Sequence, residues 1–133
     1  MKVLTVGELL KEQCDHLKLE MVSGEANLRR RIPTSEVNRP GLALAGFMAH
    51  FRAERVQIIG RGEHEFIRRS SPRRMRQILE RILAHRDIPC VVITRHLRPP
   101  RVLDDVCRRH RVPLLRTKLN TGSFVEELAA WLE

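Results

Sequence analysis

The stretch "IPCVVITR", residues 88–95, decides the fold. Residues 90–93 are continuously apolar and rich in β-branched side chains, which is typical of a central parallel strand covered by helices on both faces. The predicted strands are residues 31–37, 55–60, 88–94 and 112–115, and the predicted helices that follow them are residues 39–48, 71–86, 100–110 and 122–132, with a polar loop over residues 61–70. This alternation predicts an α/β fold with a mostly parallel sheet flanked by helices.

Local signals support the individual elements. Residues 5–8 and residues 123–126 both have the spacing of a capping box, which predicts a helix start at each place. Residues 17–21 alternate between apolar and charged side chains, as a half-buried strand does. A serine and a proline at residues 71–72 are typical of the first turn of a helix. The apolar stripe predicted for that helix consists of Met75, Ile78, Leu79, Ile82 and Leu83.

Residues 37–46 read "VNRPGLALAG" and predict another helix start. In this interpretation Asn38 caps the helix, Pro40 occupies its first turn and Gly46 ends it. The side chains predicted to pack against the core are Leu42, Leu44 and Ala45. Arg39 has no part in capping, so we expect it to be available for an anionic ligand.

The chain has 133 residues, which predicts a single domain over residues 1–133 that needs no metal or disulfide to fold. Cys14, Cys90 and Cys107 form no C-x-x-C pair and the six histidines form no H-x-x-x-H pair, which disfavours a disulfide framework and a zinc site. No apolar run approaches the ~20 residues of a membrane span, and the first residues do not resemble a secretory signal. We therefore expect a cytoplasmic protein that binds no metal and no membrane.

The formal net charge of +9 is carried mostly by arginine and is compatible with three kinds of partner. These are a nucleic acid, a small anionic ligand and an acidic protein. Four Phe, one Trp and no Tyr leave no strip of aromatic and basic residues on which bases would stack. The composition therefore disfavours nucleic acid and leaves the other two partners open.

The common catalytic motifs are missing from the sequence. It contains no G-x-x-x-x-G-K-[ST] phosphate loop, no G-x-S-x-G elbow and no H-E-x-x-H metal motif. The serines show no spacing that suggests a Ser/His/acid grouping. We therefore expect no enzyme activity and no catalytic residue in this chain alone.

Cationic and polar side chains follow the predicted strands. In an open parallel sheet, ligands bind beyond the carboxyl ends of the strands, where loops and helix N-termini converge. That edge is expected to carry an electropositive cleft for a phosphate or carboxylate, with Arg61 among its cations. The residues predicted to hold the anion are Asn38, Arg39, Thr94, Arg95, Arg116, Thr117 and Lys118.

Four segments of the chain resemble the amino-terminal domain of bacterial HPr kinase/phosphorylase. They are "VNRPGLALAG" at residues 37–46, "ERVQIIG" at residues 54–60, "IPCVVITR" at residues 88–95 and "VPLLRTKLNT" at residues 112–121. The resemblance extends from "TVGELL" at residues 5–10 to the last helix, so it covers nearly the whole chain. It implies a fold similar to the amino-terminal domains of muramyl ligases.

The resemblance also implies a biological setting. Members of this family phosphorylate a serine of the phosphotransfer protein HPr and remove that phosphate, and thereby control the sugar phosphotransferase system and carbon catabolite regulation. Their ATP, magnesium and HPr contacts belong to a carboxy-terminal catalytic domain with a phosphate loop, which these residues lack. The resemblance thus implies a non-catalytic regulatory or assembly domain without a cofactor. Its implied partners are the kinase domain of the same protein and, through it, HPr.

Several alternatives stay open at the level of sequence. The chain is either part of a longer enzyme or a free-standing basic module that docks an acidic protein or nucleic acid. Sensing of a small anionic metabolite at the cationic edge is compatible with the first alternative. The oligomeric state is not determined by the sequence, which is compatible with a homo-oligomer.

Overall fold

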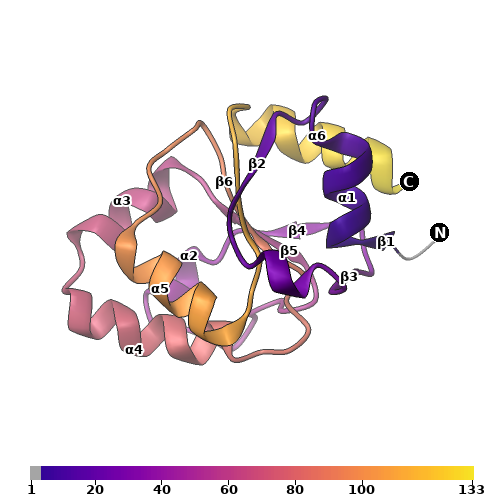
Figure 1. Ribbon diagram of the computed structural model, residues 1–133. Helices are drawn as coiled ribbons and strands as arrows, with labels where there is room; N and C mark the ends of the chain where they lie inside the picture. Colours follow the sequence, from indigo (N-terminus) through magenta and orange to yellow (C-terminus); the bar gives the residue numbers. More distant parts are fainter. Residues whose placement is uncertain (1–3) are drawn as a thin grey trace.

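A five-stranded sheet with the strand order β2-β7-β6-β5-β4 forms the centre of the molecule (Figure 1). The computed structural model describes residues 4–133. The strands of the sheet are β2 (Leu19–Ser23), β4 (Val37–Asn38), β5 (Val56–Ile59), β6 (Val91–Ile93) and β7 (Leu114–Thr117). Strands β4 to β7 run parallel, whereas β2 pairs antiparallel with β7 at one edge. The predicted α/β fold with a mostly parallel sheet is therefore confirmed.

Helices cover both faces of the sheet and create two cores. Figure 1 shows α1 (Val6–Gln13) and α6 (Thr121–Leu132) together on one side. The helices of the other side are α2 (Gly41–Leu44), α3 (Arg61–Arg69), α4 (Pro72–Leu83) and α5 (Arg101–His110). Along the central strand, Cys90 and Val92 belong to the core under α1 and α6, whereas Val91 and Ile93 belong to the opposite core. This alternation follows from the two-residue period of a strand, and it explains why residues 90–93 are continuously apolar.

Two predicted helix starts have the expected geometry. In α1, the Thr5 side chain accepts a hydrogen bond from the Glu8 N–H and the Glu8 carboxylate accepts one from the Thr5 N–H, which is a complete capping box. In α4, Ser71 Oγ accepts from the Arg74 N–H at 3.1 Å. The five residues of the predicted α4 stripe are all buried. Both predictions are confirmed.

The prediction of one strand over residues 31–37 is wrong. Arg31–Ile32 forms β3, which pairs antiparallel with β1 (Leu4–Thr5) in a separate two-stranded sheet, and a short 3₁₀ helix, η1 (Glu25–Asn27), precedes it. Only Val37–Asn38 joins the main sheet, as β4. Pro33 follows β3 directly and has no N–H to continue a ladder, so the chain leaves one sheet before it enters the other.

The polar loop predicted for residues 61–70 is also wrong, because most of this segment forms helix α3. Glu63 and Ile67 are the buried residues of α3, so its buried stripe contains a carboxylate and lacks an apolar repeat. The Gly60 N–H donates to the Glu63 carboxylate and begins the helix. A glycine followed three residues later by Glu was the local signal for this start, and it was missed because no Ser, Thr, Asp or Asn marks it.

Residues 37–46 only partly follow the prediction. Asn38 lies in β4 and does not cap α2, whose N-cap residue is Pro40 without a side-chain hydrogen bond. Leu42 and Ala45 are exposed, while the buried side chains are Ala43 and Leu44. Because α2 has only one turn, only a narrow face of it contacts the core, and Ala43 and Leu44 occupy that face. Gly46 has a positive φ of 101° and ends the turn as predicted.

The last helix begins one turn earlier than its predicted capping box. Asn120 is the N-cap of α6, and its Oδ1 accepts a hydrogen bond from the Ser123 N–H at 2.8 Å. Ser123 therefore occupies the first turn and does not cap the helix. The side chains of Phe124, Leu128 and Leu132 are buried, whereas those of Val125 and Trp131 are half-buried. In the part of the chain that the structure describes, no helix has the length and apolar character needed to cross a bilayer.

Candidate anion-binding rim

The carboxyl ends of β4, β5, β6 and β7 meet at one edge of the sheet, because these strands are parallel. We call this edge the rim. Arg39 follows β4, Arg61 follows β5 after one glycine, and Arg95 follows β6 after Thr94. Arg116 and Thr117 end β7 and Lys118 follows them. The fold thus places all of the predicted anion-binding residues along the rim, and their hydrogen bonds decide which of them are available to a ligand.

Arg39 is already paired with a carboxylate. Its Nη2 donates to Glu63 Oε1 at 2.8 Å, and the same oxygen accepts the Gly60 N–H at 2.8 Å. The Glu63 side chain is only 10% exposed. The N-terminus of α3 therefore has an internal anion where an external phosphate would bind. The sequence gives little sign of this role for Glu63, because the segment that carries it lacks an apolar helical repeat.

Gly60 is closely surrounded by the polar side chains of the rim. A Cβ atom at Gly60 would lie 2.6 Å from Arg39 Nη2 and 3.0 Å from Thr121 Oγ1. The Thr121 hydroxyl is hydrogen-bonded to the hydroxyl of Thr94, which is fully buried, at 2.7 Å. A side chain at Gly60 would therefore displace the Arg39 guanidinium, and Thr94 holds the start of α6 against the end of β6.

Asn38 has a structural role in the edge of the sheet. Its Nδ2 donates to Gln57 Oε1 at 2.7 Å. Gln57 is buried on the neighbouring strand, and its own amide group donates to the carbonyls of Arg52 and Arg55. This chain of hydrogen bonds fixes β4 and the loop that precedes β5.

The end of β7 is held by pairing with β2. The Arg116 guanidinium donates to the Glu20 carboxylate, and this hydrogen bond is the main reason why the pKa of Glu20 lies below its usual value. His96 also contacts Glu20 at 3.2 Å. The buried Thr117 hydroxyl donates to the Leu17 carbonyl at 2.6 Å. Arg116 and Thr117 therefore stabilise the antiparallel edge of the sheet.

Arg61, Arg95 and Lys118 are the predicted rim cations whose charge is not compensated. All three are exposed, and within residues 4–133 none of their side chains forms a hydrogen bond or an ion pair. The loop that carries Arg95 is well fixed, since its N–H donates to the Leu119 carbonyl at 2.8 Å. Arg95 and His96 have positive φ angles of 60° and 53°, which is uncommon for residues other than glycine. The backbone thus holds the Arg95 loop beside the Lys118 segment.

A hollow of about 350 Å³ lies at the β2 end of the rim, next to Lys118. The Lys118 N–H contacts the Lys18 carbonyl at 3.4 Å, which brings the two lysine segments together. The residues that line the hollow are Cys14, Asp15, Lys18, Leu19, Glu20 and Lys118. Glu20 pairs with Arg116, so the two lysines supply most of the uncompensated charge at this place.

Comparison with known proteins agrees with the resemblance in the sequence. The family described as "HPr Serine kinase N terminus" matches residues 4–132. The chain belongs to this family. The HPr kinase/phosphorylase of Caldicellulosiruptor bescii is 36% identical over 129 residues, which are 96% of this chain and 40% of that protein. That of Caldanaerobacter subterraneus subsp. tengcongensis is 35% identical over 133 residues, which are 100% of this chain and 42% of that protein.

The relative from Alkaliphilus metalliredigens, also an HPr kinase/phosphorylase, is 33% identical over 133 residues and is 41% covered. The chain thus spans about two fifths of the length of the curated relatives it matches.

In this HPr serine kinase N-terminal domain, residues 4–133 contain no group of three or more His, Cys, Asp and Glu side chains that would hold a metal ion. Burial raises the pKa of the Cys90 thiol to about 12 and also raises that of Cys107, so both thiols are protonated and poor nucleophiles at neutral pH.

Proposed function

We propose that this chain is a non-catalytic regulatory or assembly domain of an HPr kinase/phosphorylase. The observation that supports this proposal is the match of residues 4–132 of this chain to the family. The curated relatives of this chain are more than twice as long as the chain itself. The 133 residues contain no phosphate-loop motif, so we assign ATP and magnesium to another region of such an enzyme. HPr is then reached through the kinase region of the same protein, in the cytoplasm.

We also propose that the domain senses a small anionic metabolite at the rim. The pairing of Arg39 with Glu63 and of Arg116 with Glu20 leaves Arg61, Arg95 and Lys118 uncompensated along the rim. We place the site at Lys118 and Arg95, whose segments are joined by a backbone hydrogen bond, with Lys18 across the hollow. Two lysine ammonium groups and a guanidinium would bind a phosphate or carboxylate through charge-assisted hydrogen bonds. Asp15 and Glu20 at the same hollow would disfavour ligands with a high negative charge.

The first test separates the domain role from catalysis. The purified chain is incubated with HPr, ATP and magnesium, and phosphoserine on HPr is measured by mass spectrometry. In parallel, the chain replaces the matching region of the Caldanaerobacter enzyme, and the chimera is assayed in the same way. We expect phosphorylation by the chimera and none by the chain alone. Phosphoserine formed by the chain alone would overturn the non-catalytic role, and an inactive, unfolded chimera would count against a shared domain function.

The second test concerns the metabolite. Thermal unfolding is measured with inorganic phosphate, sugar phosphates, nucleotides and acidic metabolites, first on the wild-type chain and then on Lys118→Ala and Arg95→Ala. We expect a rise in Tm with one class of anion and its loss in both variants. Arg81→Ala removes an exposed cation from α4 and should keep the full rise. A rise that survives both rim substitutions would refute this site.

A further inference from the structure

The exposed large apolar side chains of residues 4–133 are concentrated in one region. They are Leu42, Phe47 and Phe66, with exposed fractions of 66%, 50% and 42%. Leu42 belongs to α2 and Phe47 to the loop after it, while Phe66 lies on α3, which packs against α2. We call these three residues the α2 surface. Exposed apolar side chains gathered on two neighbouring helices and the loop that follows one of them commonly mark a protein interaction site.

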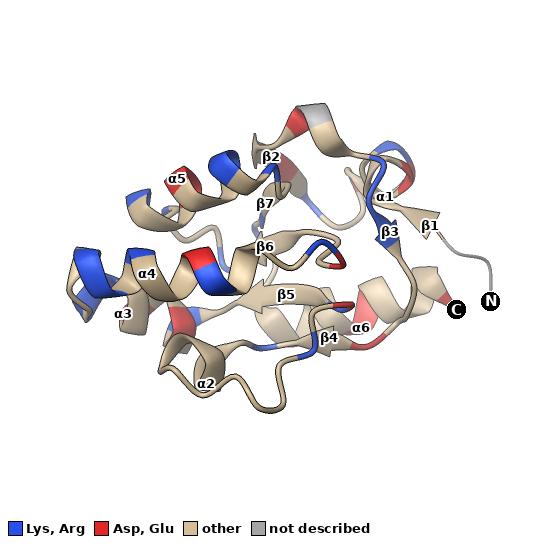
Figure 2. Ribbon diagram, turned by 90° about the horizontal axis from the view of Figure 1, so that it is seen from below, with Lys and Arg blue, Asp and Glu red and all other residues tan. Residues whose placement is uncertain are grey.

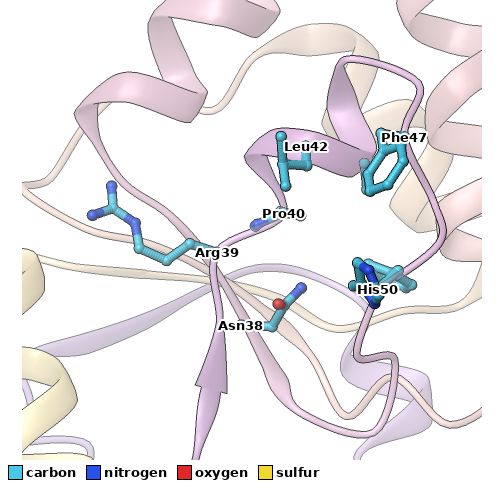
Figure 3. Close-up of a pocket in the computed structure, with 8 residues that line it drawn as sticks. Asn38, Arg39, Pro40, Leu42, Phe47 and His50 are labelled. Carbon is cyan, nitrogen blue, oxygen red and sulfur yellow. The ribbon is translucent and has the colours of Figure 1, made fainter.

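The backbone forces Leu42 and Phe47 outward. Ala43 and Leu44 occupy the core-facing side of the single turn of α2, so Leu42 is left on the solvent side. The positive φ of Gly46 then reverses the chain and places Phe47 beside Leu42 (Figure 3). The Phe47 ring is tilted against the His50 ring, with their centroids 5.9 Å apart. Packing against the core thus explains residues 37–46 only in part, because it does not account for the exposed Leu42 and its neighbour Phe47.

A small hollow opens between these side chains. Its volume is about 70 Å³, and Figure 3 shows Leu42 and Phe47 on one side with His50 across from them. The residues lining it are Asn38, Arg39, Pro40, Leu42, Ala43, Phe47, His50 and Phe51, and they include no carboxylate. The Arg39 guanidinium points away from the hollow, toward Glu63. The hollow is therefore suited to an apolar side chain and not to a charged ligand.

Positive charge borders the α2 surface. A Cβ atom at Gly46 would lie 3.9 Å from Arg74 Nη2, so the Arg74 side chain reaches the end of α2. Arg73 and Arg74 are exposed and form no ion pair within residues 4–133. Figure 2 shows basic residues gathered at this end of α4, while α2 itself carries none. A second copy docked through the same surface would bring these arginines together, so like-charge repulsion disfavours self-association here.

We propose that the α2 surface binds an acidic amphipathic segment of another protein. Leu42, Phe47 and Phe66 would contact the apolar face of that segment, and Arg73 and Arg74 would pair with its carboxylates. The proposal extends the regulatory or assembly role to a stated kind of partner. It is independent of the metabolite site, which lies beside β2 and β7, because the sheet order places β2 and β4 at opposite edges.

The probe for this surface is a fluorescent helical peptide of about 18 residues, with Leu and Phe at positions i, i+3, i+4 and i+7 and Glu at most others. Binding to the full chain is followed by fluorescence anisotropy at low salt. One control peptide has the same composition with its apolar residues scattered, and another has Lys in place of Glu. We expect binding of the first peptide alone, with an affinity that falls as salt is added.

Variants locate the binding. Leu42→Ser/Phe47→Ser should weaken it about tenfold or more, since exposed anchors carry most of such an interaction. Arg73→Glu/Arg74→Glu should also weaken it about tenfold, while Arg81→Glu/Arg86→Glu, which changes the net charge equally at and just beyond the C-terminal end of α4, should leave it nearly unchanged. All affected side chains are exposed, and circular dichroism verifies that each variant is folded.

Four results would overturn the proposal. The first two are the absence of peptide binding at low salt and peptide binding that survives the Leu42→Ser/Phe47→Ser change. The third is an equal loss of affinity in the two charge-reversed variants. The fourth is a concentration-dependent dimer of the chain that the Leu42→Ser/Phe47→Ser change abolishes. The metabolite response and peptide binding are both measured on the wild-type chain. An absent metabolite response with intact peptide binding refutes the metabolite site alone, whereas a normal metabolite response with no peptide binding refutes the α2 surface alone.

Discussion

Arg30 joins three segments that are far apart in the chain. Its Nη1 donates to the carbonyls of Ile88 at 2.7 Å and Arg86 at 3.3 Å, and its Nη2 donates to the His110 carbonyl at 3.1 Å. Burial lowers the pKa of Arg30, and no carboxylate of residues 4–133 pairs with it. His110 is the last residue of α5, where the helix dipole places partial negative charge. Carbonyl groups thus replace the usual counter-ion.

Replacing Arg30 should therefore destabilise the fold. Arg30→Met leaves partly buried carbonyls without donors, and we expect the free energy of unfolding to fall by about 2–3 kcal/mol. Urea denaturation followed by circular dichroism measures this loss. Arg29→Met, at the exposed neighbouring position, is the matched control and should change stability by no more than ~0.5 kcal/mol. Similar losses in the two variants would contradict the role of Arg30.

The two buried thiols should make the folded state less stable at alkaline pH. The thiol of Cys90 has its pKa raised to about 12 by burial, against 9.0 for an exposed thiol, and that of Cys107 is raised as well. Above about pH 9 the unfolded chain therefore loses protons that the folded chain keeps, and the unfolded state gains stability. The chain has no tyrosine, so few other groups titrate between pH 8 and pH 10.

We expect the free energy of unfolding to decrease as the pH rises from about 9 to about 11. Cys90→Ala/Cys107→Ala should show a shallower decrease, although its stability at pH 7 is lower because the substitutions leave cavities. Denaturant titrations at a series of pH values provide the measurement, and equal slopes in the wild type and the double variant would contradict the assignment.

At the scale of elements, helix ends are determined by single side chains that compete to cap them. In α6 both Asn120 and Ser123 are residue types that cap well, and both precede apolar helical positions. The structure uses Asn120, because the hydroxyl bond between Thr121 and Thr94 holds the first residue of the helix against β6. The helix therefore starts where a tertiary contact fixes it.

Substitutions at the two candidate caps should differ. Asn120→Ala removes the acceptor for the Ser123 N–H, and we expect a loss of about 1 kcal/mol in the free energy of unfolding. Ser123→Ala should be neutral to within ~0.5 kcal/mol, because its hydroxyl caps nothing. Thermal and urea unfolding of both variants provide the measurement. A larger loss for Ser123→Ala would mean that the helix begins one turn later.

At the scale of the whole molecule, one sheet serves two cores. The first lies under α1 and α6, the second under α2 to α5, and each strand of the centre contributes alternate residues to both. The sheet cannot lose one core without exposing half of its apolar surface. We therefore expect the molecule to unfold in a single cooperative step.

Phe124 tests this cooperativity. It is fully buried in the core under α1 and α6, so Phe124→Ala should cost about 3–5 kcal/mol. Trp131 is the single tryptophan and reports on α6, whereas far-ultraviolet circular dichroism reports on all helices. The two signals should give one denaturation midpoint in the wild type and one lower midpoint in the variant. Separate midpoints for the two signals would show that the layers unfold independently.

Much of the fold was predictable from local pattern. The apolar run of residues 90–93 and the stripe of α4 report burial directly, and the alternation of strands and helices gives the parallel order. Helix α3 was missed because its buried face consists of Glu63 and Ile67, which is not an apolar repeat. Strand β2 was predictable as a strand from its alternating pattern. Its antiparallel direction was not, because that direction depends on its pairing with β7, which is distant in the sequence.

The sequence by itself determined the α/β class, the family and the edge of the sheet to which Arg39, Arg95, Arg116 and Lys118 come. Periodicity and strand direction are sufficient for this, because both are local properties. Only the tertiary structure decided which of these cations remain uncompensated. Glu63 is 24 positions from Arg39, and Glu20 is 96 positions from Arg116. Such pairs depend on how separate elements pack, so the charge available at the rim is a property of the folded chain.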